Sequence, residues 1–169
     1  MTMPWVITGG TESGIMKLVG QAIKKSSEET GIATPLIGVA PWGIISERDH
    51  FEAGGIGNGL KRRSYEYGSH KDPPEVDPAH SHSLDRNHTH FLLVDDGTAG
   101  TAAYASEVKF RGQLENEMCC TCFGLDDDGD ALPNPPLVLI VVGGGPGTFQ
   151  TVSTCHISHP VLCALKTAC

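Results

Sequence analysis

The sequence predicts an α/β fold with a mainly parallel sheet, and three stretches of the chain carry this prediction. Residues 5–20, WVITGGTESGIMKLVG, join a short apolar run, a glycine turn and a helical apolar pattern. Residues 137–142, LVLIVV, form a continuous apolar run typical of a parallel strand that is covered on both faces. Residues 143–148, GGGPGT, make a second glycine turn directly after that strand. Turns of this kind can bring the free N–H groups of a helix close to an anion.

The remaining elements follow from local patterns in chain order. Residues 35–40 and 89–94 are apolar runs that predict two more buried strands, and residues 104–118 predict a helix. Residues 43–87 are rich in glycine and proline, which predicts a long mobile insertion with local order near Trp42. The spacing of apolar residues in the first helix assigns one face to the core: Ile15, Leu18, Val19, Ala22 and Ile23.

Composition restricts the classes of function. The chain has 169 residues, enough for one domain with a real core. Its formal net charge of -8 argues against a broad nucleic-acid interface, which needs basic surface. No apolar run approaches the roughly 20 residues of a membrane helix, and no secretory signal is recognisable. The six cysteines are therefore read as reduced thiols.

Clusters of cysteines and of aspartates raise the question of a metal site. Cys119 and Cys122 have C-x-x-C spacing, but no second ligand pair follows, which favours an incidental cluster at a helix end. Asp95 and Asp96 could bind magnesium or act as acid and base, although Asp-Gly favours a turn by itself. The acidic run at 126–130 resembles a calcium loop only superficially and reads as a surface loop.

Histidines form a further candidate cluster near the third strand. His88 and His90 are two residues apart and would share a face of a strand, where they could ligate one metal ion. We find no aspartate or cysteine at a supporting spacing, so histidines at the edge of a strand are the favoured interpretation. We therefore predict no metal site.

Arg111 has two interpretations. It lies four residues after Glu107 and could form a solvated helix pair with it. Alternatively, its planar donor fork could reach over the end of the sheet to a phosphate.

Five motifs occur in a fixed order: WVITGGTESGIMKLVGQAI, IGVAPWGIISERD, NHTHFLLVDDGTAG, EVKFRGQLE and GGGPGTFQTV. In this order they resemble the cytosolic N-terminal homology region of melastatin-type transient receptor potential (TRPM) cation channels, part of the SLOG superfamily. The resemblance covers residues 5–152 apart from the loops. It implies a three-layer, Rossmann-like (SLOG) α/β domain over residues 1–152, with the insertion at 43–87 and a divergent C-terminal tail at 153–169.

The resemblance also implies a function without catalysis. The chain would be a module on the cytosolic face of a calcium-permeable or non-selective cation channel, packing against other subunits or the rest of the channel chain in a family tetramer. No cofactor is certain, but a nucleotide derivative such as ADP-ribose is the expected ligand. The expected ligand residues lie in the two glycine turns, in the turn after residue 94 and on the helix that follows: Thr8, Gly9, Gly10, Thr11, Gly14, Asp96, Gly97, Thr98, Tyr104, Arg111, Gly144, Gly145, Gly147 and Thr148.

Departures from the family pattern leave alternatives open. Related nucleotide phosphoribohydrolases carry a catalytic glutamate where this chain has Thr151, which argues against hydrolysis. The family has a strand and glycine turn before residue 5 and a Gly-Ser-Gly-Arg turn near the end, and neither is present here. The sequence therefore predicts a domain truncated at both ends. A hydrolase and a purely structural interaction domain remain the alternatives.

Overall fold

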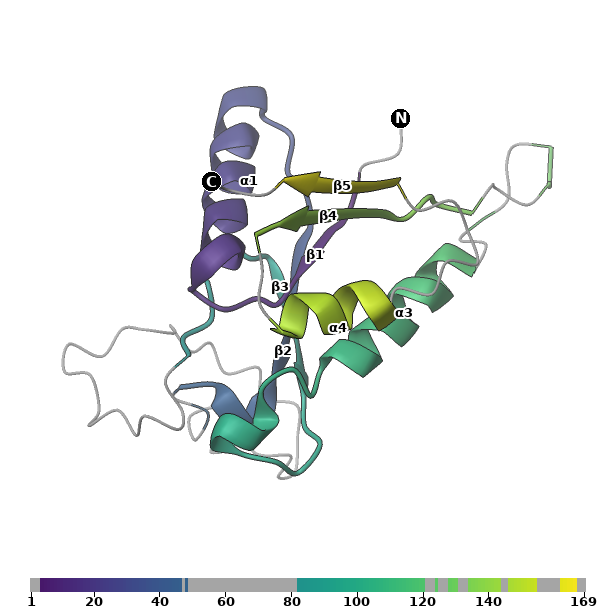
Figure 1. The fold of residues 1–169 in the computed structure, drawn as a ribbon. Coiled ribbons are helices and arrows are strands. Elements are labelled where there is room, and N and C mark those ends of the chain that lie inside the picture. Colours follow the sequence, from purple (N-terminus) through teal and green to yellow (C-terminus); the bar gives the residue numbers. More distant parts are fainter. Residues whose placement is uncertain are drawn as a thin grey trace, which may run out of the picture. The chain divides into compact units, whose positions relative to one another are not determined.

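The structure is a computed structural model that describes residues 4–46, 48, 82–120, 124, 128–130, 134–143, 146–154 and 162–166. The chain divides into two compact units, Met1–Tyr104 and Ala105–Cys169, and each is described by itself. Both units combine helices with strands (Figure 1), and their named strands pair in parallel. This arrangement confirms the predicted α/β class with a parallel sheet.

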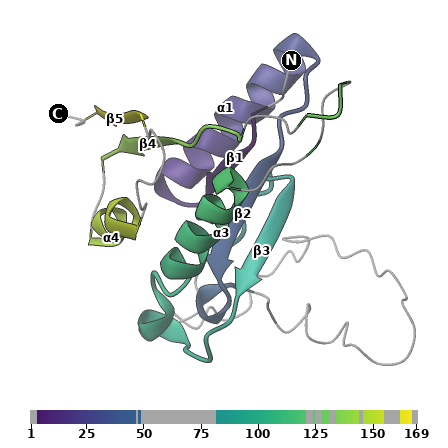
Figure 2. The ribbon, with the colours of Figure 1, turned by 90° about the vertical axis from the view of Figure 1, so that its right-hand side faces the viewer.

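The first unit contains a three-stranded sheet in the order β1-β2-β3. Its strands are β1 (Val6–Thr8), β2 (Leu36–Pro41) and β3 (His90–Val94), which agree with the predicted strands to within two residues at either end. Helix α1 (Gly14–Thr30) connects β1 to β2 and runs alongside the sheet (Figures 1 and 2). The short helices η1 (Trp42–Ile44) and η3 (Gly100–Ala103) follow β2 and β3.

The face that α1 turns to the protein differs from the predicted one. Leu18 is 60 % exposed and Ile15 is 39 % exposed, so the prediction that both face the core is wrong. The covered residues of α1 include Val19 and Ile23 from the predicted face, together with Met16, Gly20 and Ser27. The reason is steric. Gly20 lies against the carboxylate of Asp85, and a pattern that counts only apolar side chains cannot register a glycine at the closest contact.

The core of the first unit lies around the C-terminal end of β2. Its buried apolar cluster comes from β2, η1, the segment at 82–85 and η3, and consists of Ala40, Ile44, Ile45, Leu84 and Ala103. Backbone bonds join residues 44–46 to His82, with N···O distances of 3.2 Å (His82 to Ile44) and 3.0 Å (Ser46 to His82). Most of the predicted insertion at 43–87 lies outside the described residues, but both of its described ends belong to this core.

The second unit contains α3 (Val108–Cys120), β4 (Val138–Val142), α4 (Pro146–Thr154) and β5 (Leu162–Lys166). Helices α3 and α4 pack against each other, and β5 pairs with β4 (Figure 1). The sequence did not assign β5. Helix α3 begins four residues later than predicted, because residues 104–107 form a turn in which Ala105 has a φ of 63°.

Strand β4 is not covered on both faces as its apolar run predicted. Val138, Ile140 and Val142 are 52 %, 69 % and 42 % exposed, while the alternating positions Leu139 and Val141 are partly buried. An uninterrupted apolar run cannot indicate which face of a strand its neighbours cover, because both faces carry the same kind of side chain.

Candidate functional site

The first glycine turn, residues 8–14, connects β1 to α1. Gly10 has a φ of 72°, a left-handed conformation that favours glycine, and its N–H donates to the Thr8 hydroxyl at 3.0 Å. A Cβ on Gly10 would lie 2.7 Å from the Cα of Gly38 on β2, so the turn passes directly over the neighbouring strand.

Helix α1 presents its N-terminus at the end of this turn. Ser13 occupies the N-cap position but makes no side-chain hydrogen bond to the helix; its hydroxyl instead pairs with that of Thr11 at 2.9 Å. The first N–H groups of an α-helix have no partner within the helix, and they lie at its positive dipole end. The turn therefore leaves donors that suit an anion.

A series of buried hydrogen bonds connects the first glycine turn to residues 85–88. It consists of Asp85, His88 and Thr8: the Nδ1 of His88 lies 2.7 Å from the Oδ2 of Asp85, and its Nε2 lies 2.7 Å from the Oγ1 of Thr8. The side chains of His88 and Asp85 are 0 % and 1 % exposed. The second carboxylate oxygen of Asp85 accepts from Asn87 at 3.2 Å, and the Asp85 N–H donates to the Gly10 carbonyl at 2.9 Å.

These hydrogen bonds correct the interpretation of His88 as a histidine at the edge of a strand. It is neither a histidine at the edge of a strand nor a metal ligand, because both ring nitrogens have protein partners. The aspartate that the sequence analysis failed to recognise lies three residues before it, within the motif D-R-N-H. His90 is exposed and pairs with its neighbour Thr89. In the part of the chain that the structure describes, no group of three or more metal-ligating side chains occurs.

In the turn after β3, the side chains of Asp95 and Asp96 bond to nearby backbone groups, as the turn-forming tendency of Asp-Gly predicted. Gly97 has a φ of 79°, and its N–H donates to the carboxylate of Asp95 at 2.9 Å. The hydroxyl of Thr98, and to a smaller extent its backbone N–H, donate to Asp96, and these bonds lower the pKa of the Asp96 carboxyl. Because β1 and β3 are parallel, this turn lies at the same edge of the sheet as the first glycine turn.

Tyr104 ends the first unit and pairs with a histidine that the sequence analysis did not single out for this role. Its hydroxyl lies within hydrogen-bond distance of the Nε2 of His82, and the two rings meet edge to face with centroids 5.3 Å apart. Tyr104 remains 49 % exposed.

In the second unit, Arg111 lies beside the helix that follows the second glycine turn, residues 143–148. Gly143 has a φ of 63°, and Gly144 and Gly145 lie outside the described residues. Gly147 and Thr148 lie in the first turn of α4, which begins at Pro146. Arg111 on α3 donates to the Oγ1 of Thr151 at 2.7 Å, and this hydroxyl donates in turn to the Gly147 carbonyl at 3.0 Å.

The ion pair of Arg111 differs from the solvated pair considered with Glu107. Its Nε lies 3.5 Å from the Oε1 of Glu115, and the two side chains are only 11 % and 12 % exposed. Glu107 lies in the turn before α3, where its carbonyl accepts the backbone N–H of Arg111 at 2.8 Å, and Glu107 is itself buried rather than solvated. The structure thus replaces a surface pair with a nearly buried one.

Two carboxyl groups in the second unit are perturbed by burial. Burial raises the pKa of Glu107, while its own backbone N–H and Arg111 oppose the shift. Burial also raises the pKa of Glu115, again opposed by Arg111. The Oε2 of Glu107 is buried and has no hydrogen-bond partner among the described residues.

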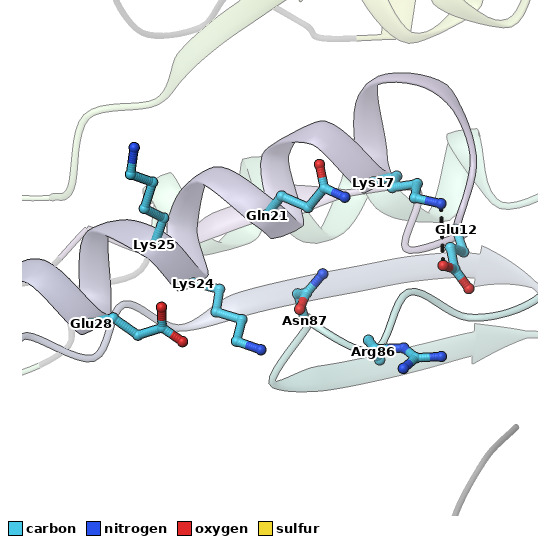
Figure 3. A pocket seen from close by; sticks show the side chains of 8 residues that line it. All are labelled: Glu12, Lys17, Gln21, Lys24, Lys25, Glu28, Arg86 and Asn87. Atoms are coloured by element: carbon cyan, nitrogen blue, oxygen red, sulfur yellow. Dashed lines mark ion pairs between the residues drawn. The ribbon is translucent and has the colours of Figure 1, made fainter. Parts of the chain in front are cut away.

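An open groove of about 530 Å³ lies between α1 and the turn at 86–87 in the first unit (Figure 3). Lys17 pairs with Glu12 at 3.3 Å at one end, and Lys24 extends toward the turn whereas Lys25 points away from it. The groove is lined by the following residues: Glu12, Lys17, Gln21, Lys24, Lys25, Glu28, Arg86 and Asn87. Of the predicted ligand residues that the structure describes, none lines this groove.

The predicted site residues thus fall into two groups. The first unit holds the first glycine turn, the turn at 96–98 and Tyr104, and the second unit holds Arg111, Gly147 and Thr148. The support that Asp85, His88 and Thr151 give to these groups was not predicted from the sequence. The spacing of Asp85 and His88 was a usable signal, whereas nothing in the sequence indicated the bond from Arg111 to Thr151.

Comparisons with known proteins agree with the motifs. The chain is 35 % identical over 154 residues to a protein of Nematostella vectensis named transient receptor potential cation channel subfamily M member-like 2. It is 35 % identical over 156 residues to subfamily M member 2 of Mus musculus, and 31 % identical over 151 residues to subfamily M member 7 of Rattus norvegicus. Each match covers 89 % of this chain but only 7–9 % of the relative.

A family model extends this agreement to almost the whole chain. The model described as SLOG in TRPM matches residues 1–164. Within the described residues, no helix combines the length and the apolar character that crossing a bilayer requires. The match confirms the resemblance of the five motifs, and the chain belongs to the family of SLOG domains of TRPM channels.

Proposed function

We propose that this chain is a ligand-sensing and subunit-packing module on the cytosolic side of a TRPM-type cation channel. The observation that carries the sensing part is the first glycine turn, where Gly10 is left-handed and α1 begins without a side-chain cap. The nearly buried guanidinium of Arg111 beside α4 supplies the matching positive charge in the second unit.

The ligand class that fits these groups is a nucleotide diphosphate derivative such as ADP-ribose. Backbone N–H groups at a helix N-terminus suit phosphate oxygens, and a guanidinium binds them with a planar fork. The proposal takes the domain to extend over residues 1–152 and treats each glycine turn as a phosphate-binding candidate by itself. The packing part draws support from the exposed apolar face of β4 and from relatives that are named as channel subfamily members.

Titration calorimetry of the whole chain with ADP-ribose tests the sensing part. We expect a saturable heat and a thermal shift, and inorganic phosphate serves as a control for weak anion binding. If millimolar ADP-ribose produces neither heat nor a thermal shift, the sensing part is wrong.

A phosphoribohydrolase is the second candidate, since the superfamily includes such enzymes. The hydroxyl of Thr151 is engaged by Arg111 at 2.7 Å, at the position where these enzymes hold a glutamate, so no carboxylate is offered there for proton transfer. An assay for ribose 5-phosphate released from AMP distinguishes the two candidates. Release at a rate above that of an Arg111→Ala variant would favour the enzyme.

A structural interaction domain with empty glycine turns is the third candidate. The exposed apolar residues Val138, Ile140 and Val142 favour association with a partner surface. Sedimentation of the chain with and without ADP-ribose separates this candidate from sensing, because packing alone predicts association that ADP-ribose does not change.

A further inference from the structure

We propose that Asp85 and His88 are positioning residues that hold the first glycine turn in its ligand-ready form through the hydroxyl of Thr8. The inference deepens the proposed function and rests on it for the ligand, but its geometry can be tested without any ligand.

The direction of each hydrogen bond follows from the donors and acceptors available. The carboxylate of Asp85 is an acceptor, and it faces the amide of Asn87 at one oxygen and the Nδ1 of His88 at the other. In a neutral His88 ring the proton therefore lies on Nδ1, which leaves Nε2 as an acceptor. The remaining partner of Nε2 is the Thr8 hydroxyl, which must donate to it.

This assignment sets the role of the Thr8 oxygen. Its hydrogen is directed to His88, and one of its lone pairs accepts the Gly10 N–H at 3.0 Å. What remains is one acceptor position and no donor. An ionised phosphate offers only acceptors, so the turn must bind phosphate through backbone N–H groups, while Thr8 suits a ligand hydroxyl such as that of a sugar.

Stability alone does not explain why Asp85 and His88 are buried as a hydrogen-bonded pair. Replacing a buried ionisable pair with apolar residues of similar volume is often neutral or stabilising. Here the helix that covers the pair has a glycine where the carboxylate approaches, because a Cβ on Gly20 would lie 2.0 Å from the Oδ2 of Asp85. The packing is thus built around the carboxylate. As a result, the Thr8 hydroxyl is held in a fixed position next to Gly10, whose backbone is left-handed.

The first measurement uses the unaltered chain. Long-range ¹⁵N NMR of the His88 ring should show a neutral imidazole with its proton on Nδ1 and an Nε2 that accepts a hydrogen bond. A ring protonated on both nitrogens, a neutral ring protonated on Nε2, or a ring that flips freely would overturn the inference whether or not ADP-ribose binds.

The second measurement uses variants and hydrogen exchange. In Thr8→Val and in His88→Gln, the Gly10 amide should exchange at least about fivefold faster, the equivalent of one lost hydrogen bond of about 1 kcal/mol. Thr8→Ser keeps the hydroxyl and should remain within about twofold of the unaltered chain. Unchanged Gly10 exchange in a folded His88→Gln variant would show that the imidazole does not position the turn.

A matched control exists in α1. The hydroxyl of Thr30 accepts the N–H of Ile32 at 3.2 Å, two residues on, as the Thr8 hydroxyl accepts that of Gly10, but it donates to the Ser26 carbonyl instead of a histidine. Thr30→Val should leave Gly10 exchange and ligand affinity unaltered. Any change at Gly10 in this variant would mean that the effect is general rather than local.

Measurements of ADP-ribose binding test the positioning role separately from the proposed function. If the unaltered chain binds ADP-ribose, Thr8→Val and His88→Gln should weaken binding about tenfold, and Thr8→Ser should restore it to within about threefold. Full affinity in both weakening variants would overturn the positioning role. If the unaltered chain binds no ADP-ribose, the sensing proposal fails, and the NMR and exchange results alone decide the positioning role.

Discussion

Replacing Gly20 with alanine tests the packing of α1 against the buried hydrogen-bond chain. A Cβ at this position would lie 2.0 Å from the Oδ2 and 3.0 Å from the Cγ of Asp85, and 3.1 Å from the Cβ of Asn87. The carboxylate cannot move aside at low cost, because both of its oxygens accept hydrogen bonds, from His88 and from Asn87.

Opposing effects set the size of the change. Alanine is favoured over glycine within a helix by about 1 kcal/mol. Overpacking costs about 1–3 kcal/mol, and losing a hydrogen bond to a charged group costs about 1.5–3 kcal/mol. We therefore expect Gly20→Ala to lower the free energy of unfolding by about 1.5–5 kcal/mol, despite its better helix propensity.

Urea unfolding followed by circular dichroism measures this change. Asp85→Ala removes the atoms that the new methyl group would strike, so Gly20→Ala should cost at least about 1 kcal/mol less in that background. Ser26→Ala, on the exposed side of the same helix, should change stability by no more than about 0.5 kcal/mol. A Gly20→Ala chain that equals or exceeds the original in stability would refute the close contact between helix and carboxylate.

Three other changes test the remaining features. Arg111→Ala should weaken ADP-ribose binding by about 1.5–3 kcal/mol in calorimetry if the guanidinium contacts phosphate, with Arg111→Lys in between because it lacks the planar fork; equal affinities would exclude the contact. Burial raises the pKa of Glu107, so its contribution to stability is present below about pH 4.3 and is lost as pH rises through the folded value. Glu107→Gln should therefore raise the melting temperature at pH 7 and flatten its dependence on pH in calorimetry, unlike the exposed control Glu117→Gln; an unaltered pH profile would contradict this. Gly38→Ala would place a Cβ 2.6 Å from the Cα of Gly10 and 2.8 Å from the Phe91 ring, which should cost at least about 1–3 kcal/mol in urea unfolding; a neutral effect would show that the turn does not pass over β2 this closely.

Much of the local structure follows from short stretches of sequence. The apolar runs at 35–40 and 89–94 predicted β2 and β3, and the step from strand to glycine turn to helix predicted the start of the first unit. The turn at 95–98 was also predictable, because an aspartate side chain bonds to backbone groups only two residues away. In these cases, the interacting groups lie within a few residues of each other.

The supports of the candidate site depend on contacts between distant residues. Thr8 and His88 are 80 residues apart, and Arg111 and Thr151 are 40 apart, so no periodicity or spacing rule relates them. The same limit explains why the covered face of α1 was misjudged and why β4 has an exposed face, since both depend on which neighbours the fold supplies.

Short motifs with local hydrogen-bonding and steric requirements were enough to predict the family, the parallel α/β class and the first glycine turn. The tertiary structure decided which side chains hold those turns in place. It placed His88 under Thr8, brought Asp85 against Gly20, and gave Arg111 the partners Glu115 and Thr151. Such pairings depend on the path of the chain through space. Only when the surrounding elements have packed are these polar groups buried, and burial makes their hydrogen bonds strong and an unpaired group costly.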